Sequence, residues 1–346
     1  MSGLVKRQTS GSRNVPDEIT VRANAAALER LAMDKHTRAW LDQFEAPTSK
    51  RYLRALGRFQ KWLGKKPTRL LLEGRRRGPD DIRLELTRYR KDLVDRGLAP
   101  NSADQYTTIL RSYFAAGGVY LGRFHRKTRI PQKTYPPPTP DYLTRQNVSD
   151  MVKSRNSMRD KFIVAFLAQT GQRVGILTAM KRDMMTKKVM RGHGIVRVPE
   201  TLRNRQGRNV NKLRRQYTFV VGRDAMKLLK LLDRVSLYEG GWLLHISSRQ
   251  IGRIVDEAAE TIGIQKKGPT TIGELWSAVH PNTLREYWRE RMREAKADLP
   301  SVLHMWGSNV PSTYGVHEFR DDELLKEYEQ AETKLSLNAE PEVGTS

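Results

Sequence analysis

The sequence contains no cysteine at any of its 346 positions. Disulfide bonds, zinc sites built on thiolates and a cysteine nucleophile are therefore all excluded. The redox compartment stays open, because a chain without thiols folds in either. Any catalytic site has to be built from other residue types.

Long apolar runs are missing as well. No stretch approaches the roughly 18 apolar residues of a membrane span, and the N-terminal region lacks the apolar run of a secretory signal peptide. Neither terminus carries a lipidation motif or a basic amphipathic helix with a continuous apolar face. We therefore expect a soluble, intracellular protein without a membrane partner.

Acidic residues are scarce relative to basic ones. The chain has 63 Lys and Arg against 38 Asp and Glu, for a formal net charge of +25. An excess of this size goes beyond what solubility needs and indicates a polyanion as partner. Nucleic acid is the leading candidate, since the features of a membrane-surface protein are missing.

The length of the chain predicts two domains, since one domain takes roughly 100 to 200 residues. Residues 122–141 are basic and rich in proline, which predicts an extended linker. Residues 1–36 predict a flexible basic arm that ends in a short Ala-rich helix. The expected domains are then residues 37–121 and residues 142–332, followed by a disordered tail over 333–346.

The first domain is expected to be entirely helical. After Pro47, apolar residues recur at steps of three and four while Lys and Arg take the other face. This pattern predicts an amphipathic helix with a cationic outer side. A second helix is expected over 79–96, and a third from a cap at Asn101 or Ser102 to Gly117.

The second domain combines helices with a small sheet. Thr144 predicts a helix cap, and the next helix, which is apolar, ends at Gly171. Alternating residues over 195–198 and 217–221 predict two short strands, which a strongly basic stretch connects. Further helices continue to an acidic one near the C-terminus. The expected fold class is mainly α with a small β-sheet.

Two arginines stand in segments that carry a family resemblance. Cleavage of a phosphodiester needs a nucleophile, cations that neutralise the non-bridging oxygens, and an acid for the departing 5′ oxygen. Residues 170–177, Thr-Gly-Gln-Arg-Val-Gly-Ile-Leu, resemble the first arginine box of the tyrosine recombinases, with Arg173 at the start of a helix. Residues 281–288 resemble the second box, with Arg285 as its arginine and Asn282 in the place of a histidine.

A third segment completes the resemblance. Residues 305–314 resemble the closing segment of the family, in which a histidine or tryptophan, here Trp306, precedes the nucleophilic tyrosine, here Tyr314. The three segments stand in the family's order, and the resemblance covers about residues 37–330. Ile176 departs from it, because the family usually has a supporting acidic residue there.

The resemblance implies a role for each site residue. Arg173 and Arg285 would clamp the scissile phosphate, a task that suits a planar, permanently charged guanidinium. Tyr314 would attack the phosphorus. Lys212, in the basic hairpin, is the candidate acid for the 5′ oxygen, although such a hairpin can also grip phosphates without taking part in the chemistry. Asn282 can bond a phosphate oxygen but cannot transfer a proton.

Several of these assignments have alternatives. Trp306 would offer its indole N–H to a phosphate or pack beneath the tyrosine segment, and His304 is its alternative. His280 could compensate for the missing histidine of the second box, or be an ordinary loop residue before a proline. The rival tyrosines are Tyr287, which directly follows the second box, and Tyr328, which lies on an acidic helix that would repel DNA.

The resemblance also implies an architecture and partners. It implies a helical, SAM-like core-binding domain and a catalytic domain that form a C-shaped clamp on duplex DNA, without metal, nucleotide or other cofactor. Leu324, Leu325 and Tyr328 lie on one side of the C-terminal helix and would dock onto a neighbouring protomer in a DNA-assembled tetramer. The alternative is a helix packed on its own domain.

The function implied is site-specific DNA recombination or integration through a 3′-phosphotyrosine intermediate. The protein is then expected in the cytoplasm, at the nucleoid, of a prokaryote or of the host of its virus or plasmid. Two other functions remain open: a DNA-binding regulator that kept the fold and lost the chemistry, and a topoisomerase of the IB type.

Overall fold

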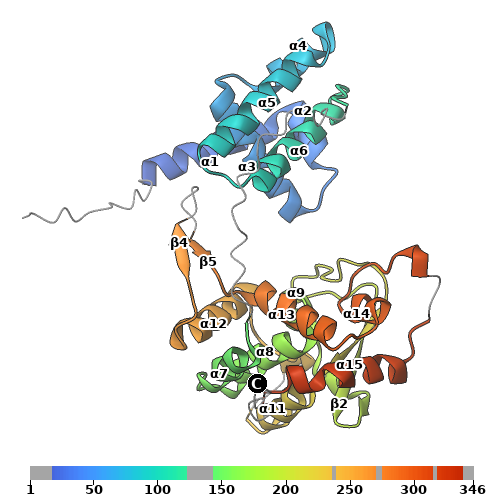
Figure 1. Ribbon diagram of the computed structural model, residues 1–346. Coiled ribbons are helices and arrows are strands. Elements are labelled where there is room, and N and C mark those ends of the chain that lie inside the picture. Colours follow the sequence, from blue (N-terminus) through green and yellow to red (C-terminus); the bar gives the residue numbers. More distant parts are fainter. Residues whose placement is uncertain (1–17, 123–142, 236–238, 270–274, 315–317, 338–346) are drawn as a thin grey trace, which may run out of the picture. The chain divides into compact units, whose positions relative to one another are not determined.

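The computed structural model describes residues 18–122, 143–235, 239–269, 275–314 and 318–337, which form two units with separate hydrophobic cores (Figure 1). The N-terminal unit contains the helices α1 Glu18–Met33, α2 Lys35–Leu41, α3 Ala46–Leu63, α4 Pro67–Arg77, α5 Asp80–Asp95 and α6 Pro100–Ala116. None of the helices in the described ranges combines the length and the apolar character that a bilayer crossing requires.

Aromatic side chains dominate the core of the N-terminal unit. Trp40 of α2, Phe59 of α3 and Phe114 of α6 are buried. Phe59 meets Tyr89 of α5 edge to face, with 5.1 Å between ring centroids, and Trp40 meets Tyr113 at 5.2 Å. Edge-to-face pairs add to the gain from burial alone. These contacts join four of the six helices.

Two sequence predictions for this unit are wrong. The flexible arm expected over 1–36 includes part of the folded unit, because α1 and α2 begin before residue 37 and Leu31 is buried in the core. Helix α6 begins at Pro100 with Ala99 as its cap, two or three residues before the cap expected at Asn101 or Ser102. Proline fits this first position because the N–H that it lacks would have no partner there.

Helix α4 was not expected at all. Leu70 and Leu71 anchor it in the core, but the run of arginines at its end hides the apolar pattern. The predicted linker lies almost wholly outside the described residues, as do residues 1–17 and 338–346.

The C-terminal unit is mainly helical with a small antiparallel sheet, as predicted. Its elements are α7 Arg145–Lys153, α8 Met158–Thr170, α9 Val174–Ala179, α10 Arg182–Thr186, β1 Val189–Met190, β2 His193–Val198, β3 Tyr217–Val221, α11 Arg223–Asp233, the 3₁₀ turn η1 Glu239–Gly241, α12 Ser248–Thr261, β4 Lys267–Pro269, β5 Leu275–Ser277, α13 Pro281–Glu294, α14 Leu299–Met305, the 3₁₀ turn η2 Ser312–Tyr314 and α15 Asp321–Leu335. The strand order of the sheet is β1-β2-β3, and β4 pairs with β5 alone.

Helix α8 lies at the centre of the C-terminal unit. Every residue from Phe162 to Thr170 is buried, so the helix is surrounded by protein on all sides. It packs against α7, α11 and α13 (Figure 1). The preceding helix α7 has the cap that the sequence predicted, since the Thr144 side chain accepts a hydrogen bond from the backbone N–H of Asn147. The C-terminal end of α8 is therefore held firmly where the first arginine box begins.

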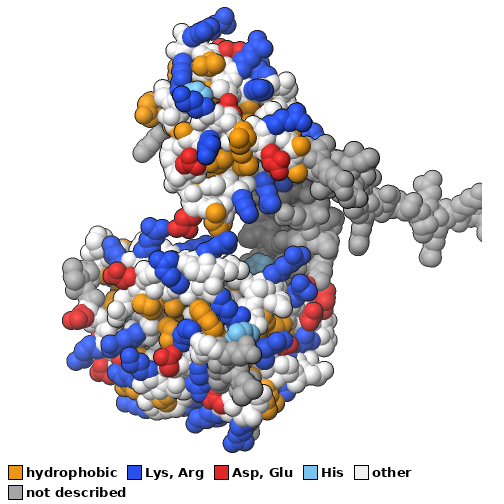
Figure 2. All heavy atoms as spheres, turned by 180° about the vertical axis from the view of Figure 1, so that it is seen from behind, with side chains coloured by type: hydrophobic (Ala, Val, Ile, Leu, Met, Phe, Trp, Pro, Cys, Tyr) orange, Lys and Arg blue, Asp and Glu red, His pale blue; other side chains and the backbone are white. Residues whose placement is uncertain are grey.

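Basic side chains cover much of the surface of both units. Figure 2 shows Lys and Arg scattered over the visible face of each unit, with fewer Asp and Glu among them. In the C-terminal unit, several cations lie on the loop between β2 and β3; those exposed are Arg203, Arg205, Arg208, Lys212, Arg214 and Arg215. The net charge therefore remains on the surface, where a polyanion can reach it.

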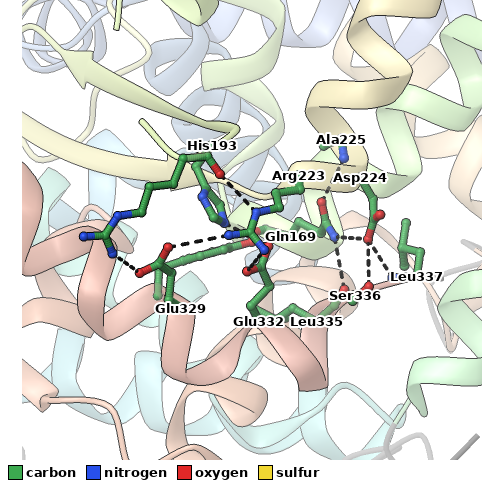
Figure 3. Close-up of polar contacts among 12 residues, drawn as sticks. Gln169, His193, Arg223, Asp224, Ala225, Glu329, Glu332, Leu335, Ser336 and Leu337 are labelled. Carbon is green, nitrogen blue, oxygen red and sulfur yellow. Dashed lines mark hydrogen bonds and ion pairs between the residues drawn. The ribbon is translucent and has the colours of Figure 1, made fainter. Parts of the chain in front are cut away.

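The C-terminal helix α15 packs on its own unit, which corrects the route predicted for self-association. Leu324, Leu325 and Tyr328 are buried in the core of the C-terminal unit. Acidic side chains of α15 contact basic residues of β2 and α11. Glu332 lies 2.8 Å from His193 of β2 and 3.1 Å from Arg223 of α11 (Figure 3). The apolar side of this helix is thus occupied within the chain and does not face a neighbour.

The residues after α15 are also fastened. The Asp224 carboxylate accepts hydrogen bonds from the backbone N–H of Leu337 at 2.8 Å and from the hydroxyl of Ser336 at 3.1 Å (Figure 3). The hydroxyl of Ser149 donates to the Leu337 carbonyl at 2.8 Å. The disordered tail predicted over 333–346 is therefore wrong at its start, because residues 333–337 are held in place.

Removal of this fastened end should destabilise the C-terminal unit. A chain that ends after Leu335 loses the three contacts above and the burial of Leu337, which together stabilise by roughly 3 kcal/mol. Its melting temperature, followed by circular dichroism, is expected to fall by several degrees. A chain that ends after Leu337 keeps every contact described and is the matched control. Equal melting temperatures for both truncations would contradict the role given to residues 336 and 337.

Candidate active site

The first arginine box forms a tight turn that only glycine allows. Helix α8 ends at Thr170, and Gly171 adopts a left-handed conformation with φ of +60°. A Cβ atom at Gly171 would lie 2.7 Å from the ring of Trp288 on α13. A larger residue would therefore both clash with this ring and be strained in the left-handed conformation. The Gly171 carbonyl accepts a hydrogen bond from Arg285, which joins the two arginine boxes.

Both predicted arginines bond to a second turn, which follows α14. Arg173, the cap of α9, donates from Nη1 to the Gly307 carbonyl at 3.0 Å. Arg285, on α13, donates from Nη2 to the Trp306 carbonyl at 2.6 Å. Two guanidinium groups from distant parts of the chain therefore lie side by side at consecutive carbonyls.

The charge of Arg285 is unusually well buried. Its residue is 4% exposed, and burial lowers the pKa of its guanidinium to about 9, with the positive charge of Arg173 acting in the same direction. The group still carries its charge at neutral pH. The Trp306 ring supports it, with 4.2 Å from the guanidinium carbon to the ring centroid.

Such an arrangement suits an oxyanion that accepts hydrogen bonds through two of its oxygens. Two like charges held close together favour an anion in their neighbourhood, and a guanidinium matches the geometry of phosphate oxygens. Arg289, one helical turn after Arg285, has its guanidinium carbon 5.0 Å from the centroid of the Trp306 ring, and its charge is paired with Glu286 at 2.6 Å. These groups have the properties of a phosphate site.

Lys212 lies on an ordered loop beside the first arginine box. Asn211, which is 2% exposed, holds both sides of the loop by donating to the carbonyls of Pro199 and Arg215, each at 2.8 Å. Val210 packs 3.4 Å from the place that a Cβ of Gly175 would take in α9. The exposed Lys212 is thus presented from a braced loop, next to the helix that Arg173 begins.

Asn282, His280 and His304, the remaining candidates from the second and third segments, lie in three different surroundings. Asn282 is exposed in the first turn of α13, on the same face as Arg285 because three residues separate them. The Nδ1 atom of His280 accepts from the Thr283 backbone and caps α13. His304 points to the sheet, since its Nε2 accepts from Thr218 N at 3.0 Å and its ring stacks on Phe319.

Tyr314 differs from its rivals in exposure. It lies in the turn η2 and is 48% exposed, whereas Tyr287 and Tyr328 are buried. The hydroxyl of Tyr328 donates to the Gln169 carbonyl, and that of Tyr287 to the Lys334 carbonyl, so both serve in packing. Among the described contacts of Tyr314, none joins it to Arg173 or Arg285. The structure therefore brings the arginines and Trp306 together and presents the tyrosine on the neighbouring segment.

Sequence reasoning missed three residues of this site. Gln172 and Tyr217 lie directly behind the arginines and bond to each other at 2.9 Å. Arg289 was not among the expected site residues, although its spacing of four from Arg285 places both on one side of the helix. No comparable pattern joins Gln172 to Tyr217, because they come from separate elements.

Comparisons with solved structures show the fold. The Tn1549 transposon integrase in complex with transposon right end DNA is similar with a TM-score of 0.53 at 13% identity, over 85% of this chain and 98% of that chain. A lambda integrase dimer bound to a COC' core site has a TM-score of 0.49 at 15% identity, over 93% of this chain and 98% of that chain. No family model and no curated protein matches the sequence. The chain has the fold of the tyrosine recombinases and integrases, as the motifs predicted.

Proposed function

We propose that this protein is a site-specific DNA recombinase or integrase that cuts and rejoins duplex DNA through a tyrosine. The observation that carries the proposal is the pair of guanidinium groups, Arg173 and Arg285, bonded to adjacent carbonyls of one turn. Two like charges held this close repel each other, and an anion such as the scissile phosphate would offset that repulsion. The surface charge of the chain supplies the attraction for DNA.

In the proposed reaction, Arg173 and Arg285 bind the two non-bridging oxygens of the scissile phosphate. The Tyr314 oxygen attacks phosphorus, and its bond to phosphorus forms as the bond to the 5′ oxygen breaks. Lys212 gives a proton to the departing 5′ oxygen, and the phenol proton passes to water because Asn282 cannot accept it. The 3′-phosphotyrosine keeps the energy of the broken bond, so a 5′ hydroxyl can reverse the step.

Recombination between two duplexes involves four strands and one protomer for each. We therefore include self-association into a tetramer on DNA in the proposal, through a surface other than the buried side of α15. The N-terminal helical unit adds further DNA contacts through the cationic side of α3. A protein with this activity acts on DNA at the nucleoid of a prokaryote, or on the DNA of a mobile element that the prokaryote carries.

The proposal is tested by trapping the covalent intermediate. Duplexes from the DNA that flanks the gene carry a nick just 3′ of the candidate cleavage position. After attack, the short fragment that bears the free 5′ hydroxyl is lost, and the protein stays on the DNA. A band that survives denaturing electrophoresis and disappears with protease is the expected result. Peptide mapping should place the DNA on Tyr314.

The trapping experiment separates the proposed function from a DNA-binding regulator, and a plasmid relaxation assay separates it from a type IB topoisomerase. A DNA-binding regulator would shift these duplexes in a native gel and give no covalent band. A type IB topoisomerase would relax supercoiled plasmid of any sequence, which a site-specific recombinase is not expected to do. Absence of any covalent band with all flanking duplexes, together with retained DNA binding, would favour the regulator.

A further inference from the structure

Two buried polar side chains behind the arginines take no part in the reaction described above. Gln172 stands between Gly171 and Arg173 and is 1% exposed. Its amide nitrogen donates to the Met305 carbonyl at 2.7 Å and to the Thr170 carbonyl at 3.2 Å. Its amide oxygen accepts from the hydroxyl of Tyr217 at 2.9 Å. The amide is therefore bonded at both ends.

Tyr217 begins β3 and lies beneath the turn that both arginines touch. A Cβ atom at Gly307 would lie 2.8 Å from the Cζ atom of the Tyr217 ring, and Gly307 has a φ of +63°. Backbone and ring are thus in contact at a distance that only glycine allows. Burial raises the pKa of Tyr217 to about 12 despite the nearby cations Arg173 and Arg285, so its hydroxyl keeps the proton that it donates to Gln172.

Three consecutive carbonyls of this turn have three different donors. Gln172 bonds to the carbonyl of Met305, Arg285 to that of Trp306, and Arg173 to that of Gly307. A rotation of the turn would move both acceptors of the guanidinium groups together. Gln172 is the neutral member of this set, and it can hold the turn without competing for the phosphate.

We propose that Gln172 and Tyr217 are positioning residues for the reaction. Together they form a brace, from the Tyr217 hydroxyl through the Gln172 amide to the Met305 carbonyl, that sets the turn and thereby the direction of both guanidinium groups. The inference rests on the proposed function, because it assumes that those groups bind the scissile phosphate. Neither brace residue touches DNA. A misplacement of about 1 Å at a reacting centre can cost on the order of 100-fold in rate.

The test compares Tyr217→Phe, Gln172→Met and the double variant with the wild-type chain. Both substitutions keep the size of the side chain and remove its hydrogen bonds. The control is Ser149→Ala, which also removes one buried hydrogen bond in the same unit, to Leu337 and away from the turn. The measurements are the single-turnover rate of covalent adduct formation on a nicked duplex, the DNA concentration at half-maximal rate, and the melting temperature.

Each single brace variant is expected to lower the maximal rate by roughly 10- to 100-fold, while the half-saturating DNA concentration stays within about twofold. The rate of the double variant should lie within about twofold of the rate of the slower single variant, because both changes disable the same brace. Ser149→Ala should lower the melting temperature and keep the wild-type rate.

Other results would overturn the inference. Brace variants that lose melting temperature but react at the rate of Ser149→Ala would show a role in folding alone. Rate losses that multiply in the double variant would show two independent residues rather than one brace. If Tyr217→Phe failed to fold, Gln172→Met would decide by the same criteria. A wild-type chain that forms no adduct would instead remove the proposed function, and the inference with it.

Discussion

Tyr314→Phe should abolish the covalent DNA adduct while DNA binding is retained. The substitution removes only the phenol oxygen, which is the proposed nucleophile, from a side chain that is 48% exposed. We expect the rate of adduct formation to fall by on the order of 10⁴-fold or more, since no other group can form the bond. The native gel shift should be unchanged, because the arginines and the basic loop remain.

The rival tyrosines provide the matched controls. Tyr287→Phe and Tyr328→Phe each remove one buried hydroxyl that donates to a backbone carbonyl. Both variants should lose about 1 kcal/mol or more of stability and still form the adduct. An adduct that persists in Tyr314→Phe and disappears in either control would assign the nucleophile to that other tyrosine.

Arg285→Lys should be nearly inactive although it keeps a formal positive charge. An ammonium cannot bond to the Gly171 and Trp306 carbonyls at once and also stack over the Trp306 ring as the guanidinium does. Loss of one preorganised donor to a developing oxyanion costs about 10²- to 10³-fold. We expect a loss of that size in the adduct rate.

The residual activity of Arg285→Lys should also depend on pH. Burial and the neighbouring Arg173 lower the pKa of the cation at this position. A lysine starts from an ordinary pKa roughly two units below that of arginine, and the same burial lowers it further. Because only the charged form binds phosphate, the remaining rate should fall as the pH rises from 7 to about 9.

A second arginine of the same helix provides the control. Arg293 has a side chain that is 75% exposed and is paired with Glu290. Arg293→Lys should leave the adduct rate and its pH dependence at the wild-type level, because a surface ion pair tolerates either cation. Equal losses in both lysine variants would mean that position 285 has no special role.

Local patterns in the sequence predicted most of the C-terminal unit. A continuous apolar segment located α8, Thr144 located the start of α7, and residue alternation located β2 and β3. The arginine boxes were recognisable because each is a short run with a turn of its own. Strands of two or three residues were not predicted, since they contain too few residues for a period to show. Helix α4 was not predicted because the run of arginines at its end hides its apolar pattern.

Contacts between residues far apart in the sequence could not be predicted from local patterns. The acidic side of α15 and its apolar residues were consistent with docking on a neighbour or on the chain itself. The burial of those apolar residues in the C-terminal core, together with Arg223 and His193 opposite the glutamates, decided between them. In the same way, Gln172 gave no indication of its partner until β3 placed Tyr217 against it.

The sequence by itself determined the charge of +25, the absence of thiol chemistry and the two arginines with a late tyrosine. These properties follow from residue types and from neighbours within one helical turn, which a linear pattern contains. Only the tertiary structure decided that Arg173 and Arg285 bond to adjacent carbonyls and that residues 336 and 337 are fastened at Asp224. Such contacts depend on how several helices pack at once, and pairs that meet through packing leave no fixed spacing in the sequence.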